Sequence, residues 1–418
     1  MMAAKVTHVE RFTLQVPFVD RVRTEMERAG VHTWSELELT RVETDAGIVG
    51  WGETIQNYTW GRVYDVNRVI GKPPAEMMWD DSLGAGLQMA LFDAAGKLAE
   101  VPVYRLLGTK YRDWCAISFW DHDMSPEKYE TEAKVAVDLG YTCIKIKTRP
   151  WFDVRETIRR ISAVTPDHFR IDADWNAFLN NASNALPLLR ELEETFPKIK
   201  IFEDPIARHD GSGNHFLRGQ IQTAIAHHYG VIGAREGLEM GGVCDGWVIG
   251  GGVSQIMRQA TAAASLNMPF FLQMVGAAPT TALSLHLSAV LSHAQWPTIT
   301  CHELYEHSLL TQRMPVLEGY ARVPETPGLG IDLDEDAISK YRVDKANHTL
   351  PQRLIRVTRP GGVHIYFANS QQKWVFYGHG SQPVDEWGCR TDLLDDDGSK
   401  EFADLFARAS QSPVVTRD

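Results

Sequence analysis

Residues 143–149, CIKIKTR, set two lysines two positions apart inside an apolar, β-branched stretch. Side chains alternate between the faces of a β-strand, so Lys145 and Lys147 share one face while Ile144 and Ile146 share the other. Two ammonium groups that close repel each other, and the core of an α/β protein offers little water to screen them. The pattern therefore predicts a buried strand whose lysine-bearing face lies opposite negative charge.

The chain on both sides of this stretch, over about residues 113–310, alternates short apolar strands with amphipathic helical segments. The other strand candidates are WCAISFW (114–120), FRIDAD (169–174), IKIFEDP (199–205), TAIAHHYG (223–230), CDGWVIG (244–250), PFFLQMVG (269–276) and ITCHELYE (299–306). Eight strands with a helical pattern after most of them predict parallel βαβ units, and eight is the number that closes a TIM barrel. An open doubly wound sheet is the alternative, but no GxGxxG motif follows the first strand to support it.

A different pattern precedes this region. Residues 36–54, ELELTRVETDAGIVGWGET, alternate as antiparallel strands do, and a helical segment follows at residues 86–100. The apolar face predicted for that helix consists of Leu87, Ala90, Leu91, Ala94 and Leu98. Its spacing is typical of an amphipathic helix packed on a sheet. We therefore expect a small α+β domain over residues 1–112, ahead of a TIM-like barrel over residues 113–320.

The remaining segment, residues 321–418, is expected to return to the N-terminal domain and then to form an extra tail. Within it, residues 363–378, VHIYFANSQQKWVFYG, are interpreted as a β-hairpin. The last residues, about 25 of them, are acidic and polar, and we expect them to be loosely ordered.

Composition and charge exclude several classes of protein. With 54 acidic and 42 basic residues, the 418-residue chain has a formal net charge of −12, which argues against a nucleic-acid or anionic-membrane partner. Its five cysteines include no CxxC pair, which favours a reducing compartment over a disulfide framework. The first residues lack the plan of a signal peptide, and no apolar run approaches the roughly 20 residues of a membrane helix. We expect a cytoplasmic protein.

Polar side chains stand at the ends of four consecutive strand candidates. The lysine pair ends one strand, Asp172 the next and Glu203 the one after, while His227 and His228 end the fourth. In a TIM barrel the carboxyl ends of all strands meet at one mouth, where the catalytic groups lie. Two carboxylates with a third oxygen or imidazole ligand suit a hard divalent cation, and Mg²⁺ is the first expectation. The lysines would then face the carboxylates and an anionic, metal-held substrate.

Six segments resemble motifs of one known family. They are TDAGIVGWGET (44–54), MALFDAAGKLAEVPVYRLLG (89–108), KIK (145–147), IDADWN (171–176), FEDPIARHD (202–210) and PGLGIDLDE (327–335). In this order, over about residues 5–343, they resemble the enolase superfamily in its mandelate racemase and muconate-lactonizing branch. The resemblance implies a barrel under a capping domain, a small-molecule carboxylate substrate and a homo-oligomer.

The resemblance also implies a chemistry. In this family Mg²⁺ binds the substrate carboxylate, a base removes the neighbouring proton, and the metal stabilises the resulting enediolate. By match to the motifs, Asp172 and Glu203 are expected to be metal ligands and Lys147 the base. Lys145 is expected to lower the proton affinity of Lys147 by like-charge repulsion and to contact the substrate carboxylate.

The fifth strand candidate departs from the family, whose third metal ligand is usually a glutamate. Counting from Glu203 with the family's spacing indicates His228, with His227 as the alternative. An imidazole in this place makes the site one charge less negative and admits Mn²⁺ or Zn²⁺ as rivals to Mg²⁺.

Two further departures bear on the reaction. Gln273 stands where racemase-like members have a catalytic histidine, and Val248 where lactonizing and epimerizing members have a second lysine, so Asp245 has no histidine to orient. A base on one face of the substrate suits proton abstraction followed by loss of a β-hydroxyl, which is dehydration of an acid sugar. An isomerase, with His302, Asp121 or a capping-loop residue serving the second face, is the alternative, and a non-catalytic binding protein is the third hypothesis.

Several other side chains are candidates for contact with the substrate. Asp174 stands where the family often has asparagine, and Glu303 lies on the last strand candidate. The loops of the capping domain normally close over the mouth in this family, and they offer Arg21, Arg23, Tyr58 and Arg62. We expect Asp174, Gln273, Glu303, Tyr58 and Arg21 to bind the substrate.

Overall fold

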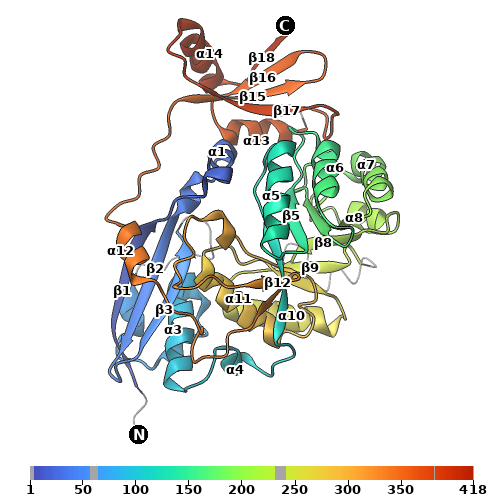
Figure 1. The fold of residues 1–418 in the computed structure, drawn as a ribbon. Helices are drawn as coiled ribbons and strands as arrows, with labels where there is room; N and C mark the ends of the chain where they lie inside the picture. The colour runs from blue at the N-terminus through green and yellow to red at the C-terminus, as the bar shows by residue number, and fades with distance from the viewer. Residues whose placement is uncertain (1–3, 57–64, 231–241, 381, 418) are drawn as a thin grey trace.

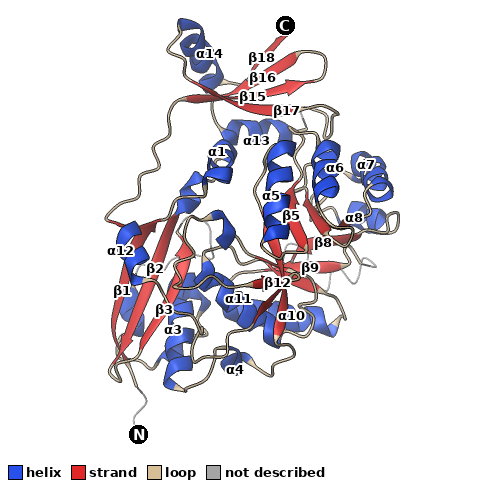
Figure 2. Cartoon of the chain, viewed as in Figure 1, coloured by secondary structure: helices blue, strands red, loops and turns tan. Residues whose placement is uncertain are grey.

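The computed structural model describes residues 4–56, 65–230, 242–380 and 382–417, and Figure 1 shows the course of the chain. Figure 2 shows three parts: an N-terminal sheet with a long helix against it, a central barrel, and a C-terminal sheet at the top of the view. Within the described ranges, no helix is long and apolar enough to cross a membrane.

The N-terminal sheet is antiparallel and has the strand order β14-β1-β2-β3. Its strands are β1 (Val6–Gln15), β2 (Glu36–Thr44), β3 (Val49–Ile55) and β14 (Arg342–Val343). Helix α3 (Ala85–Leu98) packs on β2 and β3, and α1 (Asp20–Ala29) connects β1 to β2. Since β14 follows the barrel in sequence, the chain returns to this first sheet before it enters the C-terminal part.

Two glycines allow α3 to approach β3 closely. A Cβ atom on Gly50 would come within 2.2 Å of the Ala90 carbonyl oxygen, and one on Gly52 within 2.0 Å of the Gly86 carbonyl oxygen. Most of the predicted apolar face is buried, at Leu87, Ala90, Leu91 and Ala94. The close approach buries other faces of the helix as well, so α3 is enclosed over most of its length.

The central sheet closes into the barrel that the strand pattern predicts. Its parallel strands are β4 (Trp114–Trp120), β5 (Cys143–Lys147), β6 (Arg170–Asp174), β7 (Ile199–Glu203), β8 (Ala224–His228), β9 (Gly246–Ile249), β10 (Phe270–Leu272) and β11 (Thr298–Ile299). Consecutive strands pair from β4 to β10, β11 pairs with β4, and a parallel bridge joins Gln273 to Ile299. These eight strands of the described chain form a closed ring, so the open-sheet alternative is wrong.

Helices between the strands cover the outside of the barrel. They are α5 (Pro126–Asp138), α6 (Val154–Val164), α7 (Ala182–Thr195), α8 (Gly211–Arg218), α10 (Val253–Ser265) and α11 (Ala278–Val290). Asn181 caps α7 and Asp210 caps α8, by accepting bonds of 3.0 and 2.9 Å from backbone N–H groups. Because other side chains cap these helices, Asp172 and Glu203 on the preceding strands are free of that structural task.

Smaller elements complete the first two parts of the molecule. A hairpin of β12 (Val316–Leu317) and β13 (Tyr320–Arg322) extends the barrel sheet antiparallel to β4. The short α-helices are α2 (Pro74–Met77), α4 (Tyr104–Leu107) and α12 (Glu335–Tyr341), and 3-10 turns lie at His32–Ser35, Val66–Val69, Asp81–Leu83 and His302–Leu304.

The C-terminal part is a second antiparallel sheet, with the order β17-β15-β16-β18 and two helices. Its elements are β15 (Arg353–Arg359), β16 (Val363–Phe367), α13 (Ser370–Gly378), β17 (Arg390–Asp395), α14 (Lys400–Gln411) and β18 (Val414–Arg417). Two sequence expectations are wrong here. The hairpin is β15–β16, and residues 370–378 form a helix. The last residues are ordered as α14 and β18, because Phe402 and Ala409 are buried against the sheet.

The C-terminal sheet packs on loops at the carboxyl ends of β5 and β6. Trp151, Phe152 and Phe178 belong to those loops, and they share one buried cluster with side chains of the C-terminal part, namely Ile355, Val357, Ile365, Phe367, Tyr377 and Cys389. Carboxyl ends of barrel strands surround the mouth. The C-terminal part therefore sits beside the barrel mouth, and α13 lies closest to it (Figure 1).

Candidate active site

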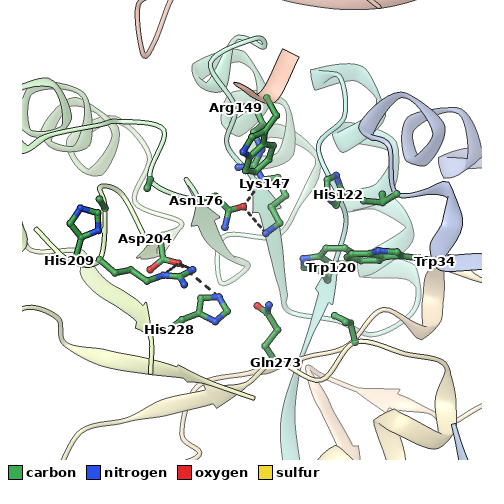
Figure 3. A pocket seen from close by; sticks show the side chains of 16 residues that line it. Trp34, Trp120, His122, Lys147, Arg149, Asn176, Asp204, His209, His228 and Gln273 are labelled. Atoms are coloured by element: carbon green, nitrogen blue, oxygen red, sulfur yellow. Dashed lines mark hydrogen bonds and ion pairs between the residues drawn. The ribbon is translucent and has the colours of Figure 1, made fainter. Parts of the chain in front are cut away.

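A cavity of about 740 Å³ opens at the barrel mouth (Figure 3). Its polar lining includes Lys147, Arg149, Asn176, Asp204, Arg208, His209, His228 and Gln273, and its aromatic lining includes Trp34, Trp120, His122 and Trp374. Trp34 comes from the N-terminal domain and Trp374 from α13 of the C-terminal part. All three parts of the molecule therefore contribute to one cavity.

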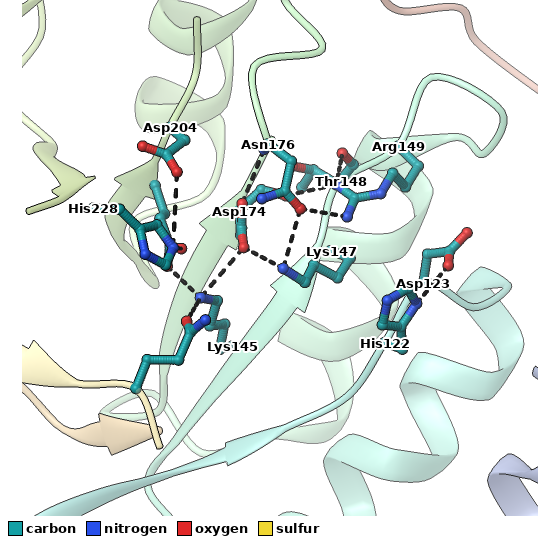
Figure 4. Close-up of polar contacts among 12 residues, drawn as sticks. His122, Asp123, Lys145, Lys147, Thr148, Arg149, Asp174, Asn176, Asp204 and His228 are labelled. Atoms are coloured by element: carbon teal, nitrogen blue, oxygen red, sulfur yellow. Dashed lines mark hydrogen bonds and ion pairs between the residues drawn. The ribbon is translucent and has the colours of Figure 1, made fainter. Parts of the chain in front are cut away.

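The two lysines of β5 lie against carboxylates of the neighbouring strands (Figure 4). Lys145 is fully buried, and its Nζ atom forms a close ion pair with Glu203 and lies 3.3 Å from Asp174 Oδ2. Lys147 donates from Nζ to Asp174 Oδ2 at 2.5 Å and reaches the cavity. On β6, Asp172 pairs in register with Lys145. The negative charge that the lysine pair predicts is present on β6 and β7.

Burial and charge give the two lysines different proton affinities. Burial lowers the pKa of Lys147, and although Asp174 opposes this change, Lys145 and Arg149 lower the pKa further. Burial also disfavours the charge of Lys145, but the carboxylates around it raise its pKa above the ordinary value. Lys147 is thus the lysine that gives up its proton more readily, as a base at the cavity wall requires.

A group of possible metal ligands lies beside the lysines. One atom each of Glu203, Asp204 and His228 lie within 4.8 Å of one another, and His228 Nε2 is 3.2 Å from Glu203 Oε1. Asp204 has a φ of +43°, a left-handed conformation that ends the alternation of β7 and turns its side chain toward the same site. Two carboxylates and an imidazole suit a divalent cation.

Asp172, the other predicted ligand, lies outside this group. Its Oδ1 atom is buried and has no hydrogen-bond partner among the described residues. Burial, followed by the negative charge of Glu203, raises the pKa of Asp172 well above its ordinary value. The positive charges of Lys145 and Lys147 offset this effect only in part, and a divalent cation would supply further positive charge. The donor set of β6, β7 and β8 therefore fits a metal.

The two histidines of β8 face opposite ways. His228 lines the cavity, whereas His227 is only 1% exposed and its Nδ1 atom lies 2.8 Å from Asp204 Oδ1. Strand alternation explains the difference. Of the two alternatives that the sequence leaves open, His228 is the one that the fold directs to the mouth.

The predicted substrate contacts divide into two groups. Asp174 is fully buried between the lysines, and Gln273 lines the cavity and accepts a hydrogen bond from Lys145 at 2.6 Å. Arg21 and Glu303 lie together in a different surface pocket, where Arg21 Nη2 donates to the Glu303 carbonyl oxygen at 2.8 Å. Tyr58 and Arg62 lie outside the described residues.

Several cavity residues were not identified from the sequence, among them Asn176, Arg149, His122 and Trp374. Asn176 accepts from Lys147 Nζ at 3.1 Å and from Arg149 Nη2 at 2.6 Å. Asn176 follows Asp174 by two positions, and Arg149 follows Lys147 by two positions. The alternation that places both lysines on one face therefore also predicts Asn176 and Arg149 on the cavity side. His122 and Trp374 carry no such signal, since Trp374 belongs to a segment far along the chain.

The sequence model of the family described as Enolase C-terminal domain-like matches residues 128–337, half of the chain. The chain belongs to the enolase superfamily, in its mandelate racemase and muconate-lactonizing branch. This confirms the family that the six motifs indicate. The superfamily's chemistry follows: a divalent metal assists removal of the proton α to a carboxylate.

Curated relatives agree with this membership. The chain is 25% identical over 363 residues to D-xylonate dehydratase of Haloferax volcanii, covering 73% of this chain and 85% of that one. It is 23% identical over 346 residues to arabinonate dehydratase of Saccharolobus solfataricus, covering 73% and 91%. It is 26% identical over 223 residues to N-succinyl-L-Arg/Lys racemase of Bacillus cereus, covering 47% and 59%. The relatives are dehydratases and isomerases, and this chain is an enzyme of the same type.

Solved structures support the fold. The crystal structure of N-succinyl Arg/Lys racemase from Bacillus cereus matches with a TM-score of 0.66 at 22% identity, covering 81% of this chain and 98% of that one. Muconate lactonizing enzyme from Pseudomonas fluorescens matches with a TM-score of 0.66 at 20% identity, covering 82% and 100%. The barrel and the capping domain are thus those of the superfamily.

Proposed function

We propose that this enzyme dehydrates a polyhydroxy acid. It removes the proton α to the carboxylate and expels a β-hydroxyl as water, which leaves a 2-keto acid. The observation that carries this proposal is the position of the proton acceptors: Lys147 reaches the cavity from β5, whereas glutamine follows β10 at Gln273 and Val248 is buried on β9. Racemization needs a proton acceptor on each face of the substrate carbon, and β-elimination needs only one.

Among the residues that the structure describes, the three candidate side chains for a second face, Asp245, Asp121 and His302, are engaged elsewhere or lie outside the cavity. Asp245 accepts from Arg218 Nε at 2.8 Å and from a β8 backbone N–H at 2.9 Å. Asp121 and His302 are buried, and neither lines the cavity. This arrangement favours elimination over isomerization.

Mg²⁺ is the proposed metal, and Asp172, Glu203 and His228 are its proposed protein ligands, with Asp204 beside them. The ion would supply positive charge to the substrate carboxylate, which becomes more negative as the α-proton leaves. The imidazole also admits Mn²⁺.

The chain's own residues divide the remaining work. Lys147 takes the α-proton onto Nζ, which Asp174 and Asn176 hold in place by hydrogen bonds. Lys145 stays charged between Glu203 and Asp174, and it adds fixed positive charge beside the proposed carboxylate position.

The cavity wall suits a sugar acid. Trp34 and Trp120 stack with their centroids 5.8 Å apart and their planes 16° apart, which gives a flat apolar surface for the C–H face of a polyhydroxy chain. Arg149 and Arg208 line the same cavity and offer donors for hydroxyl groups or for a second carboxylate. Two of the curated relatives, the xylonate and arabinonate dehydratases, are named for acid sugars.

A panel experiment tests the proposal. Purified enzyme is incubated with Mg²⁺ in D₂O against aldonic, aldaric and simple hydroxy acids, with proton NMR and 2-keto acid detection as readouts. A 2-keto acid that forms with the wild type and not with Lys147→Ala supports dehydration. Deuterium at the α-carbon without a keto acid would favour the isomerase instead. If no acid reacts although the purified enzyme holds a stoichiometric metal, the proposal fails.

We further propose, from the resemblance, that the enzyme is a cytoplasmic homo-oligomer. Light scattering on the purified protein tests the oligomer, which a monomeric mass would contradict.

A further inference from the structure

His122 stands at the cavity wall and has no role in the chemistry proposed above. It follows β4, and its ring meets those of Trp34 and Trp120 edge-on, with centroids 6.0 and 5.9 Å away. Because β4 pairs with β5, His122 and Lys147 enter the cavity from adjacent strands, and Figures 3 and 4 show them on the same side. His228 enters from β8, across the ring.

Asp123 holds the His122 ring in place. Its Oδ1 atom lies 2.7 Å from His122 Nδ1, and its other carboxylate oxygen accepts from Trp151 Nε1 at 2.8 Å. The Asp123 side chain is buried. Since Nδ1 faces a carboxylate, it carries the proton in the neutral ring, and Nε2 is the nitrogen left for the cavity.

Cations from two other parts of the molecule keep Asp123 ionised. Arg28 Nη1 of α1 lies 3.8 Å, and Lys373 Nζ of α13 lies 3.7 Å, from Asp123 Oδ2. Burial favours the neutral acid, but Lys373, His122 and Arg28 hold the pKa of Asp123 well below its ordinary value. A buried carboxylate bonded to an imidazole in this way orients the ring and stabilises its protonated form.

We propose that His122 is a second catalytic residue of this enzyme, which gives a proton to the departing β-hydroxyl, and that Asp123 is its positioning residue. The inference rests on the dehydration proposed above. It adds which residue is the acid and from which face of the substrate the hydroxyl leaves. With acid and base on adjacent strands, the proton and the hydroxyl leave from the same face of the substrate, which is a syn elimination.

The proton balance of the step is simple. Lys147 Nζ takes the α-proton, and the electrons of that C–H bond first move onto the substrate carboxylate, which gives the enediolate. They then form the new C=C bond between the α- and β-carbons as the β C–O bond breaks. The departing hydroxide takes the proton of His122 Nε2 and leaves as water. The enol product then tautomerises to the 2-keto acid, and solvent exchange returns the proton from Lys147 to His122.

The charged groups around His122 set when it holds that proton. They are Asp123 beside it and Lys147 and Arg149 from the end of β5, while Tyr129 of α5 donates to its carbonyl oxygen at 2.7 Å. Burial lowers the pKa of His122, Asp123 raises it, and the two cations lower it. An anionic substrate offsets those cations, so protonation of His122 is favoured by substrate binding.

The test compares elimination with proton exchange in His122→Gln. The substrate is the acid that wild-type enzyme dehydrates fastest in the panel, in D₂O with Mg²⁺. We expect 2-keto acid formation to fall at least about 100-fold, the usual size of a general-acid contribution. Lys147 still removes the α-proton, so deuterium should accumulate at the α-carbon of unreacted substrate. His168→Gln, an exposed histidine away from the mouth, is the control and should behave as wild type.

Two results would overturn the inference. One is His122→Gln forming keto acid at the wild-type rate, and the other is a variant that loses exchange together with elimination while its metal content and circular dichroism are unchanged. If the wild type itself forms no keto acid, the proposed dehydration fails, and that failure is separate.

A second measurement needs no substrate. In protein labelled with ¹⁵N-histidine, the signals missing from His122→Gln identify the ring. We expect the proton on Nδ1 in the wild type, and in Asp123→Asn a shift toward the Nε2–H form together with a similar loss of elimination. A wild-type ring that carries its proton on Nε2 would contradict the assignment.

Discussion

Asp174 is the residue on which the charge balance of the site depends. It touches both lysines of β5, at 3.3 and 2.5 Å, and it is fully buried. Burial alone would favour its neutral form, but Lys147, Lys145 and Arg149 hold the pKa of Asp174 well below its ordinary value. Its negative charge lets two ammonium groups share one strand face. Lys147 faces the cavity and Lys145 does not, which separates their roles.

Substitutions at single residues separate the base from the metal site. Lys147→Ala is expected to lose turnover and α-proton exchange by at least about 1,000-fold while keeping its metal, since Lys147 is not a proposed ligand.

Glu203→Gln is expected to lose both activity and metal, because a neutral amide binds a divalent cation more weakly than a carboxylate does. Metal analysis and the exchange assay distinguish the two. Full exchange in Lys147→Ala would contradict its role as the base.

Glu53 predicts a pH-dependent stability. Burial raises the pKa of Glu53 to about 7, although it accepts hydrogen bonds from Thr280 and from the Ala277 N–H at 3.0 Å. The folded chain then holds a proton that the unfolded chain has released. The free energy of unfolding therefore falls as pH rises from the ordinary carboxyl range to about 7, by about 3 kcal/mol from this group.

Glu53→Gln removes that titration. We expect the difference in unfolding free energy between wild type and variant to change by about 3 kcal/mol between pH 4 and pH 8, in favour of the variant at high pH. Urea unfolding at the two pH values measures it. A difference that stays constant would show that Glu53 titrates normally.

At the scale of the element, local pattern and local chemistry do not always agree. Residues 363–378 contain short apolar runs that suit either strand or helix. Residues 370–378 form a helix because Asn369 caps its start. The Asn369 side chain accepts a hydrogen bond from the Gln372 backbone N–H at 2.9 Å, at the first turn of α13. The barrel strands were predicted more reliably because helical segments separate them, and because four consecutive strands, β5 to β8, carry a lysine, carboxylate or histidine at a defined end.

The contact of α3 with β3 gives a prediction at this scale. In Gly52→Ala the new methyl group meets the Gly86 carbonyl oxygen, which cannot move without the helix, so we expect a loss of about 3 kcal/mol of unfolding free energy. Gly47→Ala is the control on the same hairpin. Gly47 has a φ of +75°, and a Cβ added there would meet nothing within 4 Å. Gly47→Ala is therefore expected to lose only about 1 kcal/mol of unfolding free energy, from the left-handed backbone conformation. Equal losses in urea unfolding would contradict the close approach.

At the scale of the whole molecule, the C-terminal part is built into the barrel. It shares a buried cluster with Trp151, Phe152 and Phe178, and it places Lys373 over the Trp151 ring at 4.3 Å. Lys373 is 1% exposed, and burial lowers its pKa to about 7 in spite of Asp123. Burying an ammonium group costs free energy. While Lys373 is protonated, this contact between the C-terminal part and the barrel therefore lowers the free energy of unfolding.

Lys373→Met tests that contact. The unfolded lysine keeps its proton up to its ordinary pKa, and the folded one releases it above about 7. The wild type is therefore expected to gain unfolding free energy, on the order of 2–4 kcal/mol, as pH rises from 7 to 10. Methionine fills the same space without charge, so the variant should lack this gain and be more stable than wild type at pH 7. A parallel pH dependence in both proteins would contradict a buried lysine.

The sequence by itself determined the barrel, the family and the core of the site. Alternation and strand ends are local properties, so they placed Lys145, Lys147 and Glu203 before any contact was known. Only the tertiary structure decided that Asp204 turns into the ligand group, that Arg21 and Glu303 lie in another pocket, and that Lys373 and Trp374 reach the mouth from the tail. The position of Asp204 depends on a left-handed backbone conformation that breaks the alternation of β7. The other two depend on how segments hundreds of residues apart pack together, and no local periodicity records that packing.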